Sequence, residues 1–176
     1  MGEAKMGEEF VTHELDEAIA IQRAIVDAEG VLSRDHPRKE SKRLIEQALR
    51  EDRKFLEQLE RLGQPHGATG KVEEVAGALQ ELMTETGQKT SEAESEAYEA
   101  HAVLLNLKRK QQDSGAAMIK IARAMKDTEM REAATKFAKA TKTSAQELAD
   151  ELAEFAVAIA TMDGAAMADS ARGSRR

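Results

Sequence analysis

The chain has 176 residues and a formal net charge of −7, with 34% charged and only 3% aromatic residues. This length fits one domain, and the absence of cysteine excludes disulfides, thiolate metal sites and a cysteine nucleophile. The acidic balance disfavours nucleic acid as a partner, and no apolar stretch approaches the ~18 residues of a membrane span. Few prolines and abundant Ala, Glu, Lys, Leu and Arg predict an all-α fold, and the polar start MGEAKMGEEF favours a cytoplasmic protein.

A flexible segment of residues 1–8 is expected to precede a first helix over about residues 9–32. Apolar or small side chains recur on this helix every three or four residues, which places them on one face: Val11, Leu15, Ala18, Ile25 and Leu32. Ser33 or Asp35 can cap a second helix, and Pro37 is tolerated in its first turn. This helix is expected to end at Gly63. Because the connection is short, the two helices are expected to pair antiparallel.

Polar residues interrupt the apolar faces of this hairpin. Gln22 and Glu29 fall on the first helix and Asp52 falls on the second. If the hairpin turns near residue 34, Asp52 lies level with about residue 17, close to Glu14. At about 1.5 Å per residue, Glu29 then lies roughly 18 Å from Asp52 along the hairpin. These acids are therefore not expected to share a metal ion, and they are interpreted as buried groups that fix helix register.

The middle of the chain is harder to divide. Residues 63–70, GQPHGATG, are expected to form a loop, and an apolar stripe then predicts a helix over residues 71–86. Ser91 and Glu94 have the spacing of a capping box, yet the apolar rhythm continues in phase, so residues 71–112 form either two helices or one kinked helix. The basic run LKRKQQ at residues 107–112 is interpreted as solvated charge near a helix C-terminus.

Asp113, Ser114 and Gly115 are expected to break the chain before the last helix. Asp127 and Thr128 offer a cap for this last helix, whose apolar stripe runs to Met162. A helical bundle domain over residues 9–162 is therefore predicted. Residues 163–176 are expected to be a disordered basic tail.

The order and texture of these helices resemble the ferritin-like superfamily. The stretch LREDRKFLEQLERLG closes the first hairpin, and DTEMREAATKFAKATKTSAQELADEL lies in the second. As an extra helix after the first hairpin, GKVEEVAGALQELMTETG is most similar to bacterial stress-induced members of uncertain activity. The resemblance covers roughly residues 9–160. It implies an up-down four-helix bundle of two antiparallel hairpins joined by a long crossover, with one or two extra short helices.

The metal pattern of that superfamily is degraded in this chain. A carboxylate-bridged two-metal centre needs four inward acids and usually two histidines. The second-helix motif falls on Glu51 and Lys54, and the last-helix positions fall on Thr141 and Ser144. A charged lysine cannot coordinate a metal, and the two hydroxyls replace a Glu and a His. The resemblance therefore implies a degenerate or lost metal centre.

An atypical carboxylate site for iron or another divalent metal is the alternative. The first-helix and third-helix acids that match the superfamily pattern, Glu17 with Glu96 and Glu99, do not complete such a site, because Glu17 and Glu99 are expected on the outer face. The fallback ligands are instead the acids and the histidine nearest the stripes: Glu14, Asp52, Glu94 and His101. The spacing of the four histidines does not indicate joint ligands, because His13 is expected outside and His36 and His66 are expected in loops.

Together these features predict a non-catalytic, stress-associated or structural protein without catalytic residues or a cofactor. It is expected to form a homodimer through hairpin faces rich in Ala and Met. A helical adaptor that binds a protein partner is a further alternative. Its flexible groove would be lined by Met118, Met125 and Met130.

Overall fold

The computed structural model describes the backbone of residues 2–71 and 93–173 and the side chains of residues 6–71 and 96–161. All the regular structure in these two backbone ranges is helical, which confirms the all-α prediction. The elements are α1 (Gly2–Asp35), α2 (Lys39–Gly63), the short 3-10 helix η1 (Gln64–His66), α4 (Ala93–Met125) and α5 (Thr128–Gly173). Across the same ranges, every helix is too short or too polar to cross a membrane.

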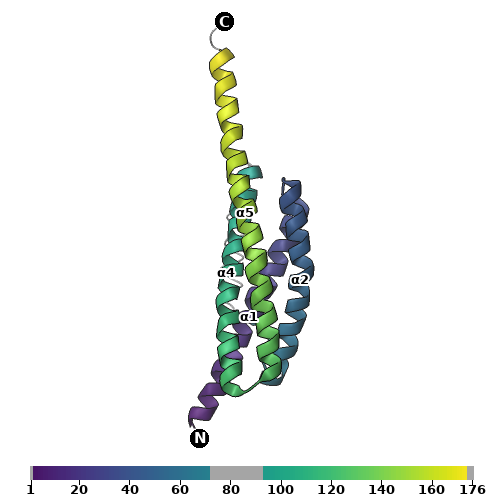
Figure 1. Cartoon of the computed structure of the whole chain (residues 1–176), viewed down its shortest axis with the longest axis vertical. Helices are drawn as coiled ribbons and strands as arrows, with labels where there is room; N and C mark the ends of the chain where they lie inside the picture. Colours follow the sequence, from purple (N-terminus) through teal and green to yellow (C-terminus); the bar gives the residue numbers. More distant parts are fainter. Residues whose placement is uncertain (1, 72–92, 174–176) are drawn as a thin grey trace.

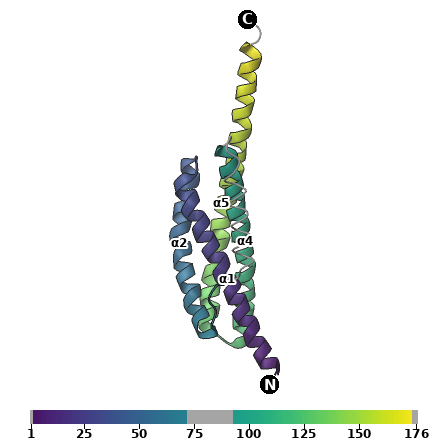
Figure 2. The same ribbon diagram turned by 180° about the vertical axis from the view of Figure 1, so that it is seen from behind.

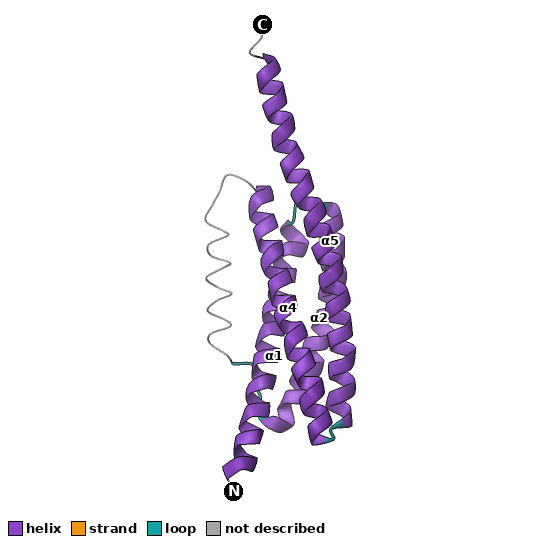
Figure 3. Cartoon of the chain, turned by 60° about the vertical axis from the view of Figure 1, so that its left-hand side comes forward, coloured by secondary structure: helices purple, strands orange, loops and turns teal. Residues whose placement is uncertain are grey.

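The four long helices pack side by side as two antiparallel hairpins, α1 with α2 and α4 with α5 (Figure 1). Helix α1 also contacts α4, and α2 also contacts α5, so each long helix has two neighbours. Seen from both sides, α2 and α4 run in the same direction (Figure 2). The first turns of α1 and the last turns of α5 project beyond opposite ends of the helical body (Figure 3).

The first hairpin turns later than the sequence indicated. Helix α1 continues to Asp35, and Ser33 donates its hydroxyl to the Gly30 carbonyl within α1 (3.3 Å) instead of capping α2. Helix α2 begins at Lys39, and its N-cap residue Arg38 has no side-chain capping bond. Because the turn is centred on residue 37, each residue of α2 pairs with a residue of α1 that lies further along the chain than predicted.

The second hairpin shows one wrong prediction and one confirmed prediction. Helix α4 runs without interruption through Asp113, Ser114 and Gly115, where a break was expected. A β-carbon added at Gly115 would lie 3.2 Å from Ala138 and 3.4 Å from Phe137, so the glycine permits a close approach of α4 and α5. The predicted cap is present, because Asp127 Oδ1 accepts a hydrogen bond from the Met130 N–H (2.9 Å).

Both terminal helices are longer than the apolar pattern indicated. Helix α1 starts at Gly2 and α5 continues to Gly173, so helix replaces the predicted segments at residues 1–8 and 163–176 over most of their length. The predicted helix at residues 71–86, the Ser91–Glu94 capping box and the choice between one and two helices lie wholly or partly outside the described residues.

The described interior contains three apolar clusters, and the two larger ones follow each other along the length of the body. The cluster nearer the α4–α5 turn contains Leu15, Leu59, Met118 and Phe137 together with smaller neighbours. The cluster nearer the α1–α2 turn contains Ile25, Ile45, Leu104 and Leu148. In chain position, Asp52, Lys108 and Gln111 fall between these two larger clusters, while Gln22 follows Ile21 of the second, and all four side chains are buried.

Two glycines inside helices should respond in opposite ways to a larger side chain. A β-carbon at Gly30 would meet nothing within 4 Å, so Gly30→Ala should stabilise the protein by about 0.5–1 kcal/mol through helix propensity. Gly115→Leu should destabilise it by about 1–3 kcal/mol, because the added atoms collide with α5. Urea unfolding followed by circular dichroism measures both changes. Equal effects of the two substitutions would contradict the close approach at Gly115.

Candidate functional site

A lysine lies completely buried in the middle of the body. Lys108, on α4, places its Nζ 2.5 Å from Asp52 Oδ2 on α2 and 2.8 Å from Glu29 Oε1 on α1. All three side chains are almost entirely shielded from solvent. One ammonium therefore connects two carboxyl groups from different helices.

Two glutamines extend this group of polar side chains. Gln22 donates from Nε2 to Asp52 Oδ1 (2.8 Å) and to the Asp52 carbonyl oxygen (3.1 Å). Gln111 donates from Nε2 to Gln22 Oε1 (3.0 Å) and to the Ala18 carbonyl oxygen (2.9 Å). We call Gln22, Glu29, Asp52, Lys108 and Gln111 the polar layer. It joins α1, α2 and α4 through buried hydrogen bonds and charges.

The charges of the polar layer balance when one carboxyl group holds a proton. The pKa of Glu29 is raised to about 8, chiefly because burial disfavours its charged form, with Lys108 lowering the pKa and the nearby Asp52 raising it. Burial opposes the charge of Lys108, but Glu29 and Asp52 outweigh burial and raise the pKa of this ammonium. At neutral pH, Lys108 is therefore charged and Glu29 is mostly protonated.

The hydrogen bonds agree with this assignment. Asp52 Oδ1 accepts from Gln22 and Oδ2 accepts from Lys108, so both oxygens of Asp52 have donors. Lys108 and Glu29 Oε1 form an ion-pair contact of 2.8 Å, and neither Glu29 oxygen has a hydrogen bond of good geometry among the described residues. Burial of the Glu29 carboxyl group without good hydrogen-bond donors favours its protonated form.

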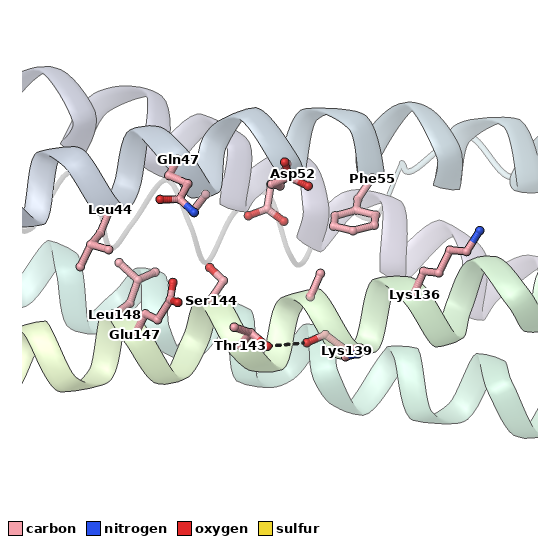
Figure 4. Close-up of a pocket in the computed structure, with 13 residues that line it drawn as sticks. Leu44, Gln47, Asp52, Phe55, Lys136, Lys139, Thr143, Ser144, Glu147 and Leu148 are labelled. Carbon is pink, nitrogen blue, oxygen red and sulfur yellow. Dashed lines mark hydrogen bonds between the residues drawn. The ribbon is translucent and has the colours of Figure 1, made fainter.

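A groove between α2 and α5 reaches the edge of the polar layer. Its volume is about 380 Å³, and Asp52 lies among its lining residues (Figure 4). Ser144 and Asp52 point toward the space between the two helices, and Lys136 and Lys139 line it from α5. The groove therefore brings one carboxylate of the layer close to the surface, on the side where the layer has no hydrogen bond to α5 among the described residues.

A second buried cluster lies at the α1–α2 turn. The rings of His36 and His101 meet edge to face with centroids 5.5 Å apart, and His36 also contacts Phe155 at 5.0 Å. Burial lowers the pKa of His36 to about 4 and also lowers the pKa of His101. Glu151 accepts hydrogen bonds on Oε1 from Arg38 Nε and Ser41 Oγ, both at 2.8 Å. The two histidines are therefore neutral, packed side chains at neutral pH.

The four fallback metal ligands lie in different places. Asp52 belongs to the polar layer, His101 belongs to the histidine cluster, and Glu14 is half-buried on α1. The side chain of Glu94 lies outside the described residues. Among the side chains that are described, no three His, Asp or Glu residues are grouped in a way that could hold a metal ion.

The positions taken from the superfamily pattern are also resolved. Glu51 and Lys54 are exposed and form a surface ion pair at 3.5 Å. Thr141 is buried and Ser144 is half-buried, and neither hydroxyl has a hydrogen-bond partner in the described part of the chain. Glu17 is half-buried and pairs with Lys110 at 2.7 Å.

Two interpretations of the polar residues were wrong. Glu29 and Asp52 are not 18 Å apart, because both contact the same Lys108 nitrogen. With the turn centred on residue 37, Asp52 lies level with Gln22, and the long side chains of Glu29 and Lys108 bridge the remaining offset of about 10 Å. The run LKRKQQ is not wholly solvated, since Lys108 and Gln111 are completely buried.

The sequence carried a signal for these two missed residues. The buried face of α4 repeats at alternating intervals of three and four: His101, Leu104, Lys108, Gln111, Gly115, Met118 and Ala122. Lys108 and Gln111 continue this repeat from Leu104, although neither is apolar. The phase of the repeat was therefore a better guide than residue polarity. The contact between His36 and His101 had no comparable signal, because they are far apart in the sequence.

No protein-family model, curated protein or solved structure matches this chain. The chemistry of the polar layer therefore rests on the geometry of its own residues.

The proton on Glu29 gives a prediction for pH dependence. Its folded-state pKa of about 8 lies above the ordinary value of 4.5, so the stability that it contributes is complete below pH 4.5 and is lost as the pH rises toward 8. Glu29→Gln keeps the shape and removes the titration. The variant should gain stability relative to the wild type by up to about 1.4 kcal/mol per pH unit in that window.

Unfolding in urea at several pH values measures this difference. His36 and His101 contribute an opposite dependence, present above pH 6.5 and lost as the pH falls through their lowered pKa values, so the difference between the two proteins is the informative quantity. A difference that stays constant from pH 5 to pH 8 would show that Glu29 is ionised in the folded protein.

Removing the buried cation should be far more damaging than removing an exposed one. Lys108→Met leaves Asp52 charged and buried without its cation, at an expected cost of about 3–5 kcal/mol. The matched control Lys110→Met breaks only the half-exposed pair with Glu17, which should cost about 1 kcal/mol or less. The double substitution Lys108→Met with Asp52→Leu should recover much of the loss. Equal midpoints of thermal unfolding for the two single variants would refute the burial of Lys108.

Proposed function

We propose that this chain is a non-catalytic, ferritin-like four-helix bundle with a structural or stress-associated role, in which Lys108 supplies the interior positive charge that a metal ion would otherwise supply. The observation that carries the proposal is the position of the Lys108 ammonium, 2.5 Å from Asp52 and 2.8 Å from Glu29. The same carboxyl oxygens would be the natural ligands of a divalent metal at this level of the bundle.

The donor set of the polar layer does not fit a two-metal centre. Its titratable groups are Glu29, Asp52 and Lys108, and its remaining members are two amides that already hydrogen-bond to each other or to backbone. Histidine is absent from the layer, since His36 and His101 form their own cluster at the α1–α2 turn. A divalent ion placed beside charged Lys108 would also meet direct repulsion from the ammonium. The layer therefore suits a permanent internal cation better than an exchangeable metal.

The arrangement of the helices supports the ferritin-like part of the proposal. The two hairpins are antiparallel, while α2 and α4 run in the same direction (Figure 1). This is the relation required of two hairpins joined by a long crossover. In such a bundle the centre of the interior, where the polar layer lies, is the ordinary location of the metal ligands.

Metal loading tests the proposal directly. After incubation with ferrous iron in air and removal of excess metal, elemental analysis of the wild-type protein should find no stoichiometric iron, and the protein should not accelerate iron oxidation. Tight stoichiometric iron that is lost on Asp52→Ala would instead support the alternative, an atypical carboxylate site that includes Asp52.

A thermal-shift experiment with Mn²⁺ tests the role of Lys108. Lys108→Met should be stabilised by added Mn²⁺, because Glu29 and Asp52 would then have no internal cation, whereas the wild type should show no shift. In the matched control, Glu29→Gln and Asp52→Asn are added to Lys108→Met, and the response to Mn²⁺ should disappear. A shift of the wild type equal to that of Lys108→Met would count against the proposal.

A further inference from the structure

Exposed apolar side chains gather at one end of the helical body. The large apolar residues that are strongly exposed in the described part of the chain are Met6 (65%), Phe10 (55%), Val157 (59%) and Met125 (47%). Met6 and Phe10 are four residues apart on α1 and therefore share a helix face. Met125 is the last residue of α4. Val157 lies far away, on the part of α5 that leads out of the opposite end of the body.

A groove of about 790 Å³ connects Phe10 and Met125. It lies between the first turns of α1, the end of α4 and the short helix η1, and its other lining residues include Ile121, Ala124 and Pro65. Thr12 donates its hydroxyl to the His66 carbonyl oxygen (2.9 Å) and so fixes α1 against η1 at this groove. We call the apolar residues Met6, Phe10, Ile121, Ala124 and Met125 the end surface.

Charges of opposite sign flank the end surface on its two sides. Glu8 and Glu9 are exposed on α1, and Arg123 and Lys126 are exposed at the end of α4 and the following turn. Lys126 has a left-handed conformation with φ of 58°, and its N–H donates to the Arg123 carbonyl oxygen (3.3 Å). The basic side is therefore set by a defined turn. The acidic residues thus lie on α1, and the basic residues lie at the end of α4 and in the turn that follows it.

We propose that the end surface binds a second copy of this chain through a two-fold contact. In an isologous contact, a two-fold rotation brings the acidic side of one copy against the basic side of the other. The same rotation brings Phe10 of one copy toward Met125 of the other, which removes both apolar side chains from water.

This contact differs from the surfaces that the sequence indicated. A homodimer through the Met-rich hairpin faces and a partner groove lined by Met118, Met125 and Met130 were expected. Met118 and Met130 are buried in the apolar core and are not available to any partner. Met125 alone of these three is exposed, and it belongs to the end surface. The proposal does not depend on the state of the polar layer, so the metal experiments and the association experiment can fail separately.

Sedimentation equilibrium of the full chain over a wide range of concentration tests the proposal. The wild type should form dimers, and Phe10→Ser and Met125→Ser should each raise the dissociation constant by about tenfold or more, as expected for central apolar contacts. The matched control Val157→Ser removes an equally exposed apolar side chain at the other end and should leave association unchanged. Circular dichroism and thermal unfolding verify that the substituted chains remain folded.

The charged sides supply a second measurement. Dimerisation should weaken with added salt, and Arg123→Glu should weaken it as well, because the basic side would then face acids of the other copy. A wild type that stays monomeric at all concentrations would overturn the proposal. So would a dimer that depends on Val157 and is insensitive to Phe10 and Met125. Binding of a different protein at this end, without self-association, would likewise exclude a second copy as the occupant.

Discussion

The burial of the Lys108 ammonium is the constraint on which the rest of the structure depends. Taking an ammonium out of water is expensive unless anionic groups and hydrogen-bond acceptors surround it. Asp52 supplies the charge and Glu29 supplies a second carboxyl group, and these come from α2 and α1 respectively. Helices α1, α2 and α4 must therefore meet at one level and in one rotation. The apolar clusters on either side then shield the layer from solvent.

Helix α5 stands in a different relation to this layer. It contributes Thr141 and Ser144 near the same level, but their hydroxyls are not hydrogen-bonded within the described part of the chain. Helix α5 is held in place mainly by its contacts with α4 and by its own buried apolar side chains, such as Phe137, Leu148 and Phe155. The groove between α2 and α5 is the consequence, and it leaves Asp52 within reach of the surface. Helices α1, α2 and α4 thus supply the residues of the polar layer, and α5 packs beside it.

The sequence was sufficient for the all-α class and for much of the core, because apolar periodicity reports which face is buried, but it did not predict that α4 continues through Gly115. Leu15, Ile25, Phe137 and Leu148 were all found on the interior side. The sequence did not predict the burial of Lys108 at the centre of the polar layer, because a lysine in a basic run is ordinarily solvated. Only its partners on other helices make this burial tolerable. The predicted register of the first hairpin was also wrong, because a turn centred a few residues later changes every pairing between residues of α1 and α2.

The polar layer also explains how an apolar interior with a regular repeat can specify one alignment. On α4 the buried positions recur with a period of seven residues, so a shift by one period would still place mostly apolar side chains opposite α1 and α2. Such a shift would bring His101 or Gly115 to the level of Asp52 and would leave its carboxylate without the ammonium of Lys108. The energetic penalty of that unpaired charge is several times RT, whereas the apolar contacts would change little. A buried cation that contributes little net stability can therefore determine the register of the whole body.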